Sequence, residues 1–466
     1  MNFPFTQHTY HQIKMLLKWL LIITPLAVIV GSINAFFLWL LSKATDFRIS
    51  TYDNYAWIIY LLPLAGVAII WAYRKFGKNS EGGNNLILDE IHASSAGIPG
   101  RMSPFVLFST VITHLFGGSA GREGTAVQIG GATAEQLGKL FRLDENDHKL
   151  ILIAGVAAGF GSIFGTPFTG AIFALEVLYI GRMRYNAIIP ALYASVIANF
   201  VTVAWGTHHS HNKLSNITDP INVAFNMDIH FLPVSLLIIK IIVASIAFGL
   251  AGYLFGELTH QVKDTLKKHI KNPYLIPVVG GAVVIAIVTA TQNYDYIGIG
   301  VKPYHEGGVA ISTAFQEGGA YWYSWISKLV LTAITLGAGF KGGEVTPLFF
   351  VGATLGNTMG VLLDGPIPLF AALGFIGVFS AATNTPLACT IMGVELFGSE
   401  YFLYFALACF TAYYFSGHTG IYTSQKVHTP KHIGSLQKFE ENLGQLRKKG
   451  KHLRPPKTNS SDDSKG

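Results

Sequence analysis

The sequence predicts an all-α polytopic membrane protein made of two inverted-topology repeats, with re-entrant and broken helices. The chain has 466 residues, of which 50% are hydrophobic and only 13% charged, against about 25% charged in an ordinary soluble domain. Apolar segments recur along it between Gly and Pro residues, and its two halves carry similar motifs. This composition excludes a soluble globule, a coiled coil and a disordered chain. The two cysteines, Cys389 and Cys409, lie in apolar runs, which excludes a disulfide framework and a Cys-based zinc site.

The expected membrane segments differ in length. The first few and residues 231–256 are long enough to span a bilayer core, whereas several others have only about 12–14 residues. Short apolar helices broken by Gly and Pro are typical of re-entrant or discontinuous helices in channels and transporters. In chain order the segments are 16–41, 55–73, 104–117, 150–164, 167–180, 187–205, 231–256, 275–291, 325–338, 346–363, 367–379, 386–397 and 402–415.

Positive charges near the ends of the long segments predict their orientation, because Lys and Arg collect on the cytoplasmic side. Lys14 and Lys18 precede the first span, and loop 257–273 carries four lysines. We therefore expect both termini inside, with span 16–41 running inside to outside and span 231–256 running the other way.

The two halves of the chain share a motif. A shift of 221 residues aligns 118–133 with 339–354, and a shift of 219 aligns Glu176 with Glu395. Related halves that enter the membrane in opposite senses form an inverted repeat, a construction found in secondary transporters. Seven of the 16 positions in the first alignment are identical: Gly118, Gly121, Glu123, Thr125, Gly131, Ala132 and Thr133.

These observations divide the chain into two parts. Residues 1–424 are expected to form the transmembrane transport domain, with repeat one at about 14–205 and repeat two at about 231–424. The remainder, 425–466, is a basic tail with ten Lys and Arg against four Asp and Glu. Such a tail is compatible with nucleic-acid binding or with a solvated cytoplasmic end; we expect the solvated end and no nucleic-acid partner.

Glu123 stands in the glycine-rich turn 117–125. Glycines let backbone amides such as that of Gly124 face an anion, and the helix expected after the turn adds the positive end of its dipole. A carboxylate at that place can simply cap the helix. We favour a functional interpretation, because ionisable residues at membrane depth are costly. As an anion, Glu123 can occupy the anion site, leave it when protonated, and carry that proton.

Two further segments have similar chemistry. The second copy of the turn offers Glu344, the amide of Val345 and the hydroxyl of Thr346, which corresponds to Thr125 in the first copy. Pro347 follows in the expected first helical turn. The third segment is Gly82-Gly-Asn84-Asn85, in which an amide side chain can donate to a small anion; spacing does not separate Asn84 from Asn85, and a plain hydrophilic loop is the alternative.

Three motifs resemble the CLC family of chloride channels and proton-coupled exchangers. They are Gly-Arg-Glu-Gly at 121–124, Gly-Gly-x-x-x-Pro at 342–347 and Gly-x-x-x-Ile-Tyr at 417–422, in the family's order, and the resemblance covers roughly residues 14–424. It implies a homodimer with one anion path per subunit, Glu123 as the gating glutamate, and Tyr422 as the tyrosine whose hydroxyl contacts the central anion.

Departures from the family pattern resemble its fluoride-exporting branch. They are Asn at 84 or 85 where most members have Ser, Thr125 where most have Pro, and Gly-Glu-x-Thr-Pro at 343–347. The resemblance implies a fluoride/proton antiporter of the bacterial cytoplasmic membrane, with fluoride, protons and lipid as partners and no cofactor. A chloride/proton exchanger or a passive halide channel is the alternative. An intramembrane enzyme is disfavoured because no Ser-His-Asp order or His-Glu-x-x-His motif is present.

One departure from the family pattern concerns the route of the proton. Many family exchangers have a second carboxylate after the position of Glu176, and this chain has Val177. We therefore expect Glu344 to take part in coupling alongside Glu123, and Glu176 to be structural, like Glu395. His208-His-Ser-His211 has metal-ligand residue types, but it lies in a polar loop without partner ligands, so no metal site is expected.

Overall fold

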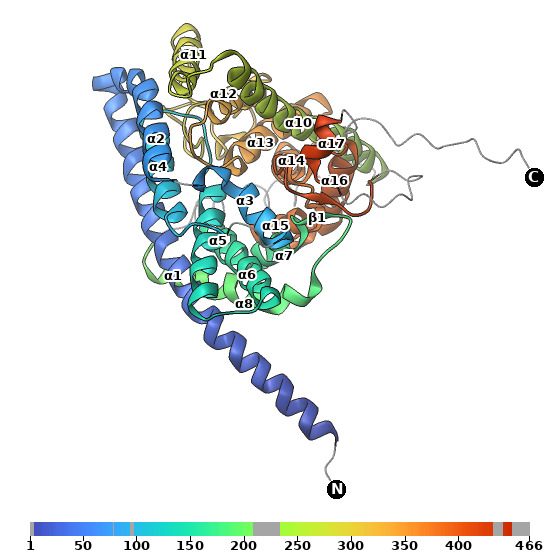
Figure 1. Cartoon of the computed structure of the whole chain (residues 1–466). Helices are drawn as coiled ribbons and strands as arrows, with labels where there is room; N and C mark the ends of the chain where they lie inside the picture. Colours follow the sequence, from blue (N-terminus) through green and yellow to red (C-terminus); the bar gives the residue numbers. More distant parts are fainter. Residues whose placement is uncertain (1–3, 78, 94–96, 208–233, 432–440, 450–466) are drawn as a thin grey trace, which may run out of the picture.

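The computed structural model describes residues 4–77, 79–93, 97–207, 234–431 and 441–449, and most of them are helical (Figure 1). The first half comprises α1 (Pro4–Tyr55), η1 (Ala56–Leu61), α2 (Leu62–Phe76), η2 (Ser80–Gly82), α3 (Gly83–His92), α4 (Met102–Leu115), α5 (Glu123–Leu140), α6 (Glu145–Phe164), α7 (Pro167–Glu176), β1 (Tyr179–Ile180), η3 (Tyr185–Ala187) and α8 (Ile188–Ala204). The second half comprises α10 (Val234–His269), α11 (Leu275–Thr291), η5 (Thr313–Phe315), α12 (Ser324–Gly337), α13 (Val345–Leu362), α14 (Ile367–Thr383), α15 (Pro386–Phe397), η6 (Ser399–Tyr401), α16 (Phe402–Phe415), β2 (Lys426–Val427) and α17 (Leu443–Lys448).

The predicted all-α membrane fold is confirmed. Apolar helices of only 10–17 residues include α4, α11, α12, α14 and α15. Helix α1 exceeds its predicted segment at both ends, because the helix continues through polar residues beyond the apolar run; its N-terminal part projects from the body of the molecule (Figure 1). Among the described residues, the stretches long and apolar enough to cross a membrane are Leu16–Ser50, Trp57–Phe76, Glu145–Phe164, Tyr185–Ala204, Leu236–His269 and Val345–Leu362.

The same helix pairs pack in both halves. Helix α5 packs on α6 as α13 packs on α14, α4 on α5 as α12 on α13, and α6 on α8 as α14 on α16. Glycines bring the central pairs into backbone contact: a Cβ on Gly130 would lie 2.0 Å from the carbonyl oxygen of Gly155, and a Cβ on Gly352 would lie 2.1 Å from that of Gly374. Such close crossings are typical of membrane helices. The duplicated motif is therefore matched by duplicated packing.

The tail departs from the sequence prediction. Two parts of it, 426–431 and 441–448, pack against the helical body, and we call them together the C-terminal clasp. Strand β2 pairs in parallel with β1, the strand that follows α7 in the chain. Leu443 and Leu446 of α17 are buried against Ile180 of that strand. The prediction of a solvated end is therefore wrong for the clasp, because the tail contributes its own apolar residues to a small core.

Charged residues fasten the clasp at two points. Arg447 donates to Glu257 and Asp264 of α10, with its Nη1 2.7 Å from the Asp264 carboxylate. Lys431 is buried, and its Nζ donates to the carbonyl oxygen of Tyr413 and to Ser416 Oγ, each at 2.9 Å. Burial lowers the pKa of Lys431 well below its usual value. The clasp thus connects the β1 segment of the first half to α10 and α16 of the second.

We expect Leu446→Ala to lower the apparent melting temperature of the purified protein. The change removes a buried side chain from the clasp core, and such truncations cost about 2–5 kcal/mol in well-packed sites. Lys448→Ala is the matched control, because Lys448 is exposed on the same helix. Thermal unfolding followed by tryptophan fluorescence tests both variants; equal melting temperatures would contradict the packed clasp.

Candidate functional site

The two glycine-rich turns pair with each other through their backbones. Gly121 N donates to Gly343 O at 2.6 Å, and Gly343 N donates to Gly121 O at 2.7 Å, which forms an antiparallel bridge. A Cβ on Gly343 would lie 2.7 Å from the amide nitrogen of Gly124, so the approach requires glycine. The bridge places the N-terminus of α5, which begins at Glu123, beside the N-terminus of α13, which begins at Val345.

The Glu123 carboxylate binds the N-terminus of the other repeat's helix. Its Oε2 accepts from Thr346 N at 3.0 Å and from Thr346 Oγ1 at 2.5 Å. Arg122 adds a backbone contact of 3.2 Å to Oε2 and an Nε contact of 3.4 Å to Oε1. The side chain is only 1% exposed. A backbone amide, a hydroxyl and a helix N-terminus together form an anion site, and the carboxylate occupies it.

Glu344 and Asn84 face the same small space beside Gly124. A Cβ on Gly124 would lie 3.0 Å from Asn84 Nδ2 and 3.5 Å from Glu344 Oε2. Both Glu344 Oε2 and Asn84 Oδ1 are buried, and neither has a hydrogen-bond partner among the residues that the structure describes. The structure therefore brings Asn84, Gly124 and Glu344 together, with unused polar atoms on two of them.

The two asparagines that sequence spacing could not separate have different partners. They belong to the first turn of α3, which begins at Gly83, so the segment is helical and not a loop. A role in anion binding stays a prediction. Asn85 Oδ1 accepts from Ser424 N at 3.0 Å, which ties α3 to the segment after α16. Asn84 instead points towards Gly124.

The two equivalent threonines also differ. Thr125 Oγ1 lies 2.7 Å from Thr110 Oγ1 on α4, whereas Thr346 Oγ1 donates to Glu123. Thr125 thus faces α4, whereas Thr346 faces the Glu123 carboxylate. The role of each hydroxyl in anion binding stays a prediction. Thr110 is a partner that the motif did not indicate. Gln128, one helical turn beyond Gly124, is buried next to Gly83 and was likewise missed, although its spacing from Gly124 places both on one helix face.

Tyr422 lies on the segment that follows α16. The side chain is 4% exposed, and its ring packs edge-on to Phe173 at a centroid distance of 6.4 Å. The structure thus buries Tyr422 against Phe173, and within the described residues no hydrogen bond joins its hydroxyl to Glu123 or Glu344.

Glu176 and Glu395 form a reciprocal pair of helix caps. Glu176 at the end of α7 accepts from Leu387 N at 3.1 Å and Ala388 N at 2.8 Å, at the start of α15. Glu395 near the end of α15 accepts from Phe168 N at 3.0 Å and Thr169 N at 2.8 Å, at the start of α7. Each carboxylate satisfies amides that a helix N-terminus leaves without partners. This bonding supports a structural role for both.

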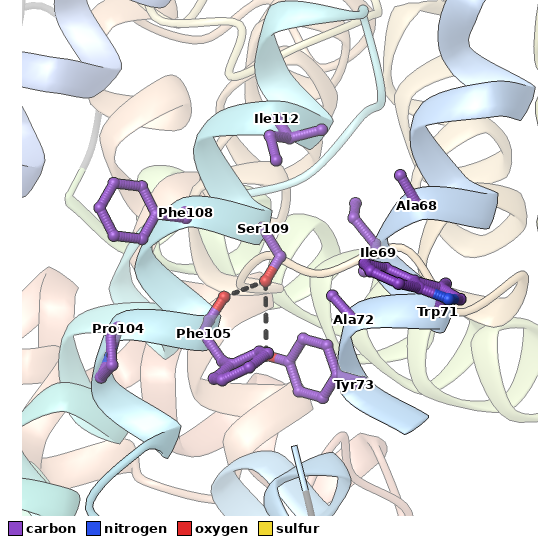
Figure 2. Close-up of a pocket in the computed structure, with 10 residues that line it drawn as sticks. All are labelled: Ala68, Ile69, Trp71, Ala72, Tyr73, Pro104, Phe105, Phe108, Ser109 and Ile112. Carbon is purple, nitrogen blue, oxygen red and sulfur yellow. Dashed lines mark hydrogen bonds between the residues drawn. The ribbon is translucent and has the colours of Figure 1, made fainter. Parts of the chain in front are cut away.

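An apolar groove of about 370 Å³ lies between α2 and α4, apart from the polar site (Figure 2). In its lining, Ser109 Oγ donates to Phe105 O and lies 3.5 Å from Tyr73 Oη. Within the described residues no cluster of His, Cys, Asp and Glu is arranged to hold a metal. The residues 208–211, weighed above as metal ligands, lie outside the described residues.

Comparison with known proteins identifies similar chains. A model of the family described as "Voltage gated chloride channel" matches residues 65–417. A "Chloride/fluoride channel protein" of Pseudomonas syringae pv. tomato is 45% identical over 416 residues, covering 89% of this chain and 88% of that protein.

Comparison with solved structures also identifies similar chains. The crystal structure of a CLC-type fluoride/proton antiporter is 34% identical with a TM-score of 0.78, and the match covers 88% of this chain and 98% of that one. A slow cyanobacterial Cl⁻/H⁺ antiporter has a TM-score of 0.69 at 17% identity, covering 85% of this chain and 94% of that one, and shares the fold.

We expect Gly343→Ala to destabilise the site. The added methyl group would collide with the backbone of Gly124, and overpacking of this kind costs about 1–3 kcal/mol. Gly256→Ala on α10 is the matched control, because a Cβ there has only ordinary contacts, the nearest at 3.5 Å. Apparent melting temperatures should fall for Gly343→Ala and hold or rise for Gly256→Ala; the reverse order would show that the bridge is not tightly packed.

Proposed function

The chain belongs to the voltage gated chloride channel family, and on that basis we propose that it is a fluoride/proton antiporter that exports fluoride while protons move inward. Family membership makes it an anion-transport protein of the membrane and not an enzyme. The coupling of fluoride to protons, the direction of export and the preference for fluoride are proposals.

The carboxylate of Glu123 at the N-terminus of α13 carries the proposal. It is bound by the amide and hydroxyl of Thr346, donors that serve a halide equally well. An ionised carboxylate competes with an anion for those donors, whereas a protonated one releases them. Glu123 thereby links halide entry to proton uptake in one residue.

A preference for fluoride follows from the donors around the site. Fluoride is the smallest halide and the strongest hydrogen-bond acceptor, so a site that removes its water must offer close donors. The proposed donors are the amides of Gly124 and Val345, the Asn84 side chain and the Thr346 hydroxyl, with the Tyr422 hydroxyl at the central position. Thr125 is a weaker candidate, because Thr110 engages its hydroxyl. Asn85 is weaker because its Oδ1 accepts from Ser424 N, and Asn84 is the asparagine whose Nδ2 lies beside Gly124. The names of two relatives include fluoride.

Glu344 is the proposed second proton carrier. Its Oε2 lies buried without a hydrogen-bond partner among the described residues, and it stands beside Gly124, next to the proposed halide position. Val177, at the place where many exchangers of the family have an acidic residue, is buried and apolar. Protons therefore need another carboxylate, and Glu344 is the one within the site.

We assign the protein to the bacterial cytoplasmic membrane as a lipid-embedded homodimer, with both termini in the cytoplasm and residues 1–424 as its transport domain. The charge distribution around the first span and along 257–273 supports this orientation. No cofactor is required, because anion exchange needs only the side chains and amides described above.

Two alternatives have specific support. A relative named as a channel favours passive halide flow, and a Cl⁻/H⁺ antiporter of the same fold favours chloride. Fluoride and chloride efflux from proteoliposomes, each measured with and without an opposing pH gradient, separates all three. The proposal predicts fluoride efflux that drives protons against their gradient; chloride efflux of equal rate, or fluoride efflux without proton movement, would contradict it.

We expect Glu123→Gln to abolish proton coupling, reducing fluoride-driven proton movement at least tenfold. The amide keeps the shape of the side chain and removes the titratable group. A pH-sensitive dye outside the vesicles reports proton movement, and an electrode reports fluoride. Glu176→Gln serves as the control, because Glu176 caps α15 and its replacement should leave the proton-to-fluoride ratio unchanged.

We expect Glu344→Gln to lower the proton-to-fluoride ratio while fluoride still passes. The reason is that Glu123 and Thr346 keep their contact in this variant, so the halide site persists. The same paired dye and electrode recordings measure the ratio. An unchanged ratio would show that Glu344 is a bystander and that protons take a route that avoids it.

A further inference from the structure

Another cavity, of about 360 Å³, lies where the start of α6 meets the segment that joins β1 to α8. Its lining is polar and basic, unlike that of the apolar groove between α2 and α4. Three cations and two side-chain amides line it, and no Asp or Glu of the described residues does. The lining residues are Asn146, Lys149, Leu150, Arg182, Met183, Arg184, Tyr185 and Asn186. Such a lining favours a ligand of negative charge.

The two arginines of this cavity have no carboxylate partner. In the part of the chain that the structure describes, neither Arg182 nor Arg184 forms an ion pair with Asp or Glu. The guanidinium carbon of Arg182 lies 5.9 Å from the ring centroid of Tyr179, a contact that leaves its charge uncompensated. The guanidinium groups are therefore available to an anion that enters the cavity.

The acidic residues in the first turn of α6 are already engaged by lysines. Lys149 Nζ lies 2.6 Å from Glu145 Oε1, and Lys18 pairs with Asp147. The Glu145 side chain is exposed and does not line the cavity, and exposed ion pairs of this kind are weak. Lys149 can therefore exchange Glu145 for a ligand, and the acidic residues nearby do not cancel the charge of the arginines.

The C-terminal clasp fixes the backbone that leads into the arginines. Strand β1 pairs with β2 of the clasp, and Ile180 O accepts from His428 N at 3.0 Å and from Thr429 N at 3.2 Å. A Cβ on Gly181 would lie 2.6 Å from Thr429 Cβ, so the two segments are in close contact. A segment that is fixed before binding loses less conformational entropy when a ligand arrives.

The size of the cavity and its donors indicate the class of anion. Pockets for small organic ligands have volumes of about 300–1,000 Å³, so this cavity is larger than a single halide ion needs. Arginine presents several N–H groups in a planar fork that matches the oxygens of phosphate and carboxylate groups. The amides of Asn146 and Asn186 add further donors. A phosphate group has enough oxygens to accept from several of these donors at once.

We propose that the cavity lined by Lys149, Arg182 and Arg184 binds a phosphate group. An anionic phospholipid and a soluble phosphate compound both present this group, and the neighbouring surface favours the lipid. Tyr185 in the lining is 69% exposed, and Ile189 at the start of α8 is 66% exposed. An acyl chain can lie along this apolar surface while the headgroup enters the cavity.

The cavity faces the cytoplasm in the proposed orientation. Asp147, in the same turn of α6 as Asn146, pairs with Lys18, and Lys18 precedes the first span on the side where positive charge collects. Basic pockets on that side of a membrane bind the headgroups of anionic lipids. Only the choice of leaflet rests on the proposed function; the binding of phosphate does not.

Binding to the purified full-length protein tests the proposal. Native mass spectrometry in detergent measures dissociation constants for phosphatidylglycerol and for the zwitterionic phosphatidylcholine. We expect phosphatidylglycerol to bind about fivefold more tightly or better. The double variant Arg182→Gln with Arg184→Gln should weaken phosphatidylglycerol binding about fivefold or more and leave phosphatidylcholine binding within about twofold. Melting temperatures with inorganic phosphate, against sodium chloride at equal ionic strength, test the soluble source.

The matched control is Lys267→Gln with Lys268→Gln, which removes two exposed charges from α10. It should leave phosphatidylglycerol binding within about twofold. The variant Arg182→Lys with Arg184→Lys keeps both charges and should retain most of the affinity. If the double glutamine variant aggregates on gel filtration, Arg182→Gln and Arg184→Gln are measured singly, each with an expected loss of about twofold or more.

The outcomes separate the two sources and the proposed function. Loss of phosphatidylglycerol binding in the double glutamine variant, without any effect of inorganic phosphate, supports the lipid. Stabilisation by inorganic phosphate that this variant loses supports a soluble ligand. The proposal is overturned if the variant responds to both probes as the unmodified protein does, or if the lysine control loses as much binding. None of these measurements involves transport, so fluoride/proton antiport stands or fails separately.

Discussion

The backbone bridge between Gly121 and Gly343 is the constraint on which the site depends. It brings the N-termini of α5 and α13 to one place, and each helix N-terminus carries the equivalent of about half a positive charge. Two such ends repel each other unless negative charge lies near them. The carboxylate of Glu123 supplies that charge, and in the proposed function a halide takes its place when the carboxylate leaves.

The same constraint explains why two matching repeats produce an asymmetric site. The motifs at 121–125 and 342–346 are nearly equivalent in sequence, yet only Glu123 reaches the opposite threonine. A second carboxylate in the same small volume would meet like-charge repulsion. Glu344 therefore remains beside Gly124 without a partner of its own in the described residues, and Thr125 turns to Thr110. The two glutamates thus have different environments, and the proposed function assigns each a separate step in proton movement.

Sequence reasoning predicted the features that are local. The glycine turns and the helices that begin after them follow from residue types and the repeat. The choice between Asn84 and Asn85 depends on how α3 is rotated against α5, because neighbouring helical residues point about 100° apart. The C-terminal clasp was missed because its apolar residues are few and their partners, such as Ile180, are far away in the chain.

A structure of the protein at high fluoride concentration and low pH tests the central claim most directly. The account predicts that the Glu123 side chain moves away from the α13 N-terminus and that a halide accepts the hydrogen bonds of Thr346 N and Oγ1 in its place. A Glu123 carboxylate that keeps both bonds while the halide binds elsewhere would contradict it.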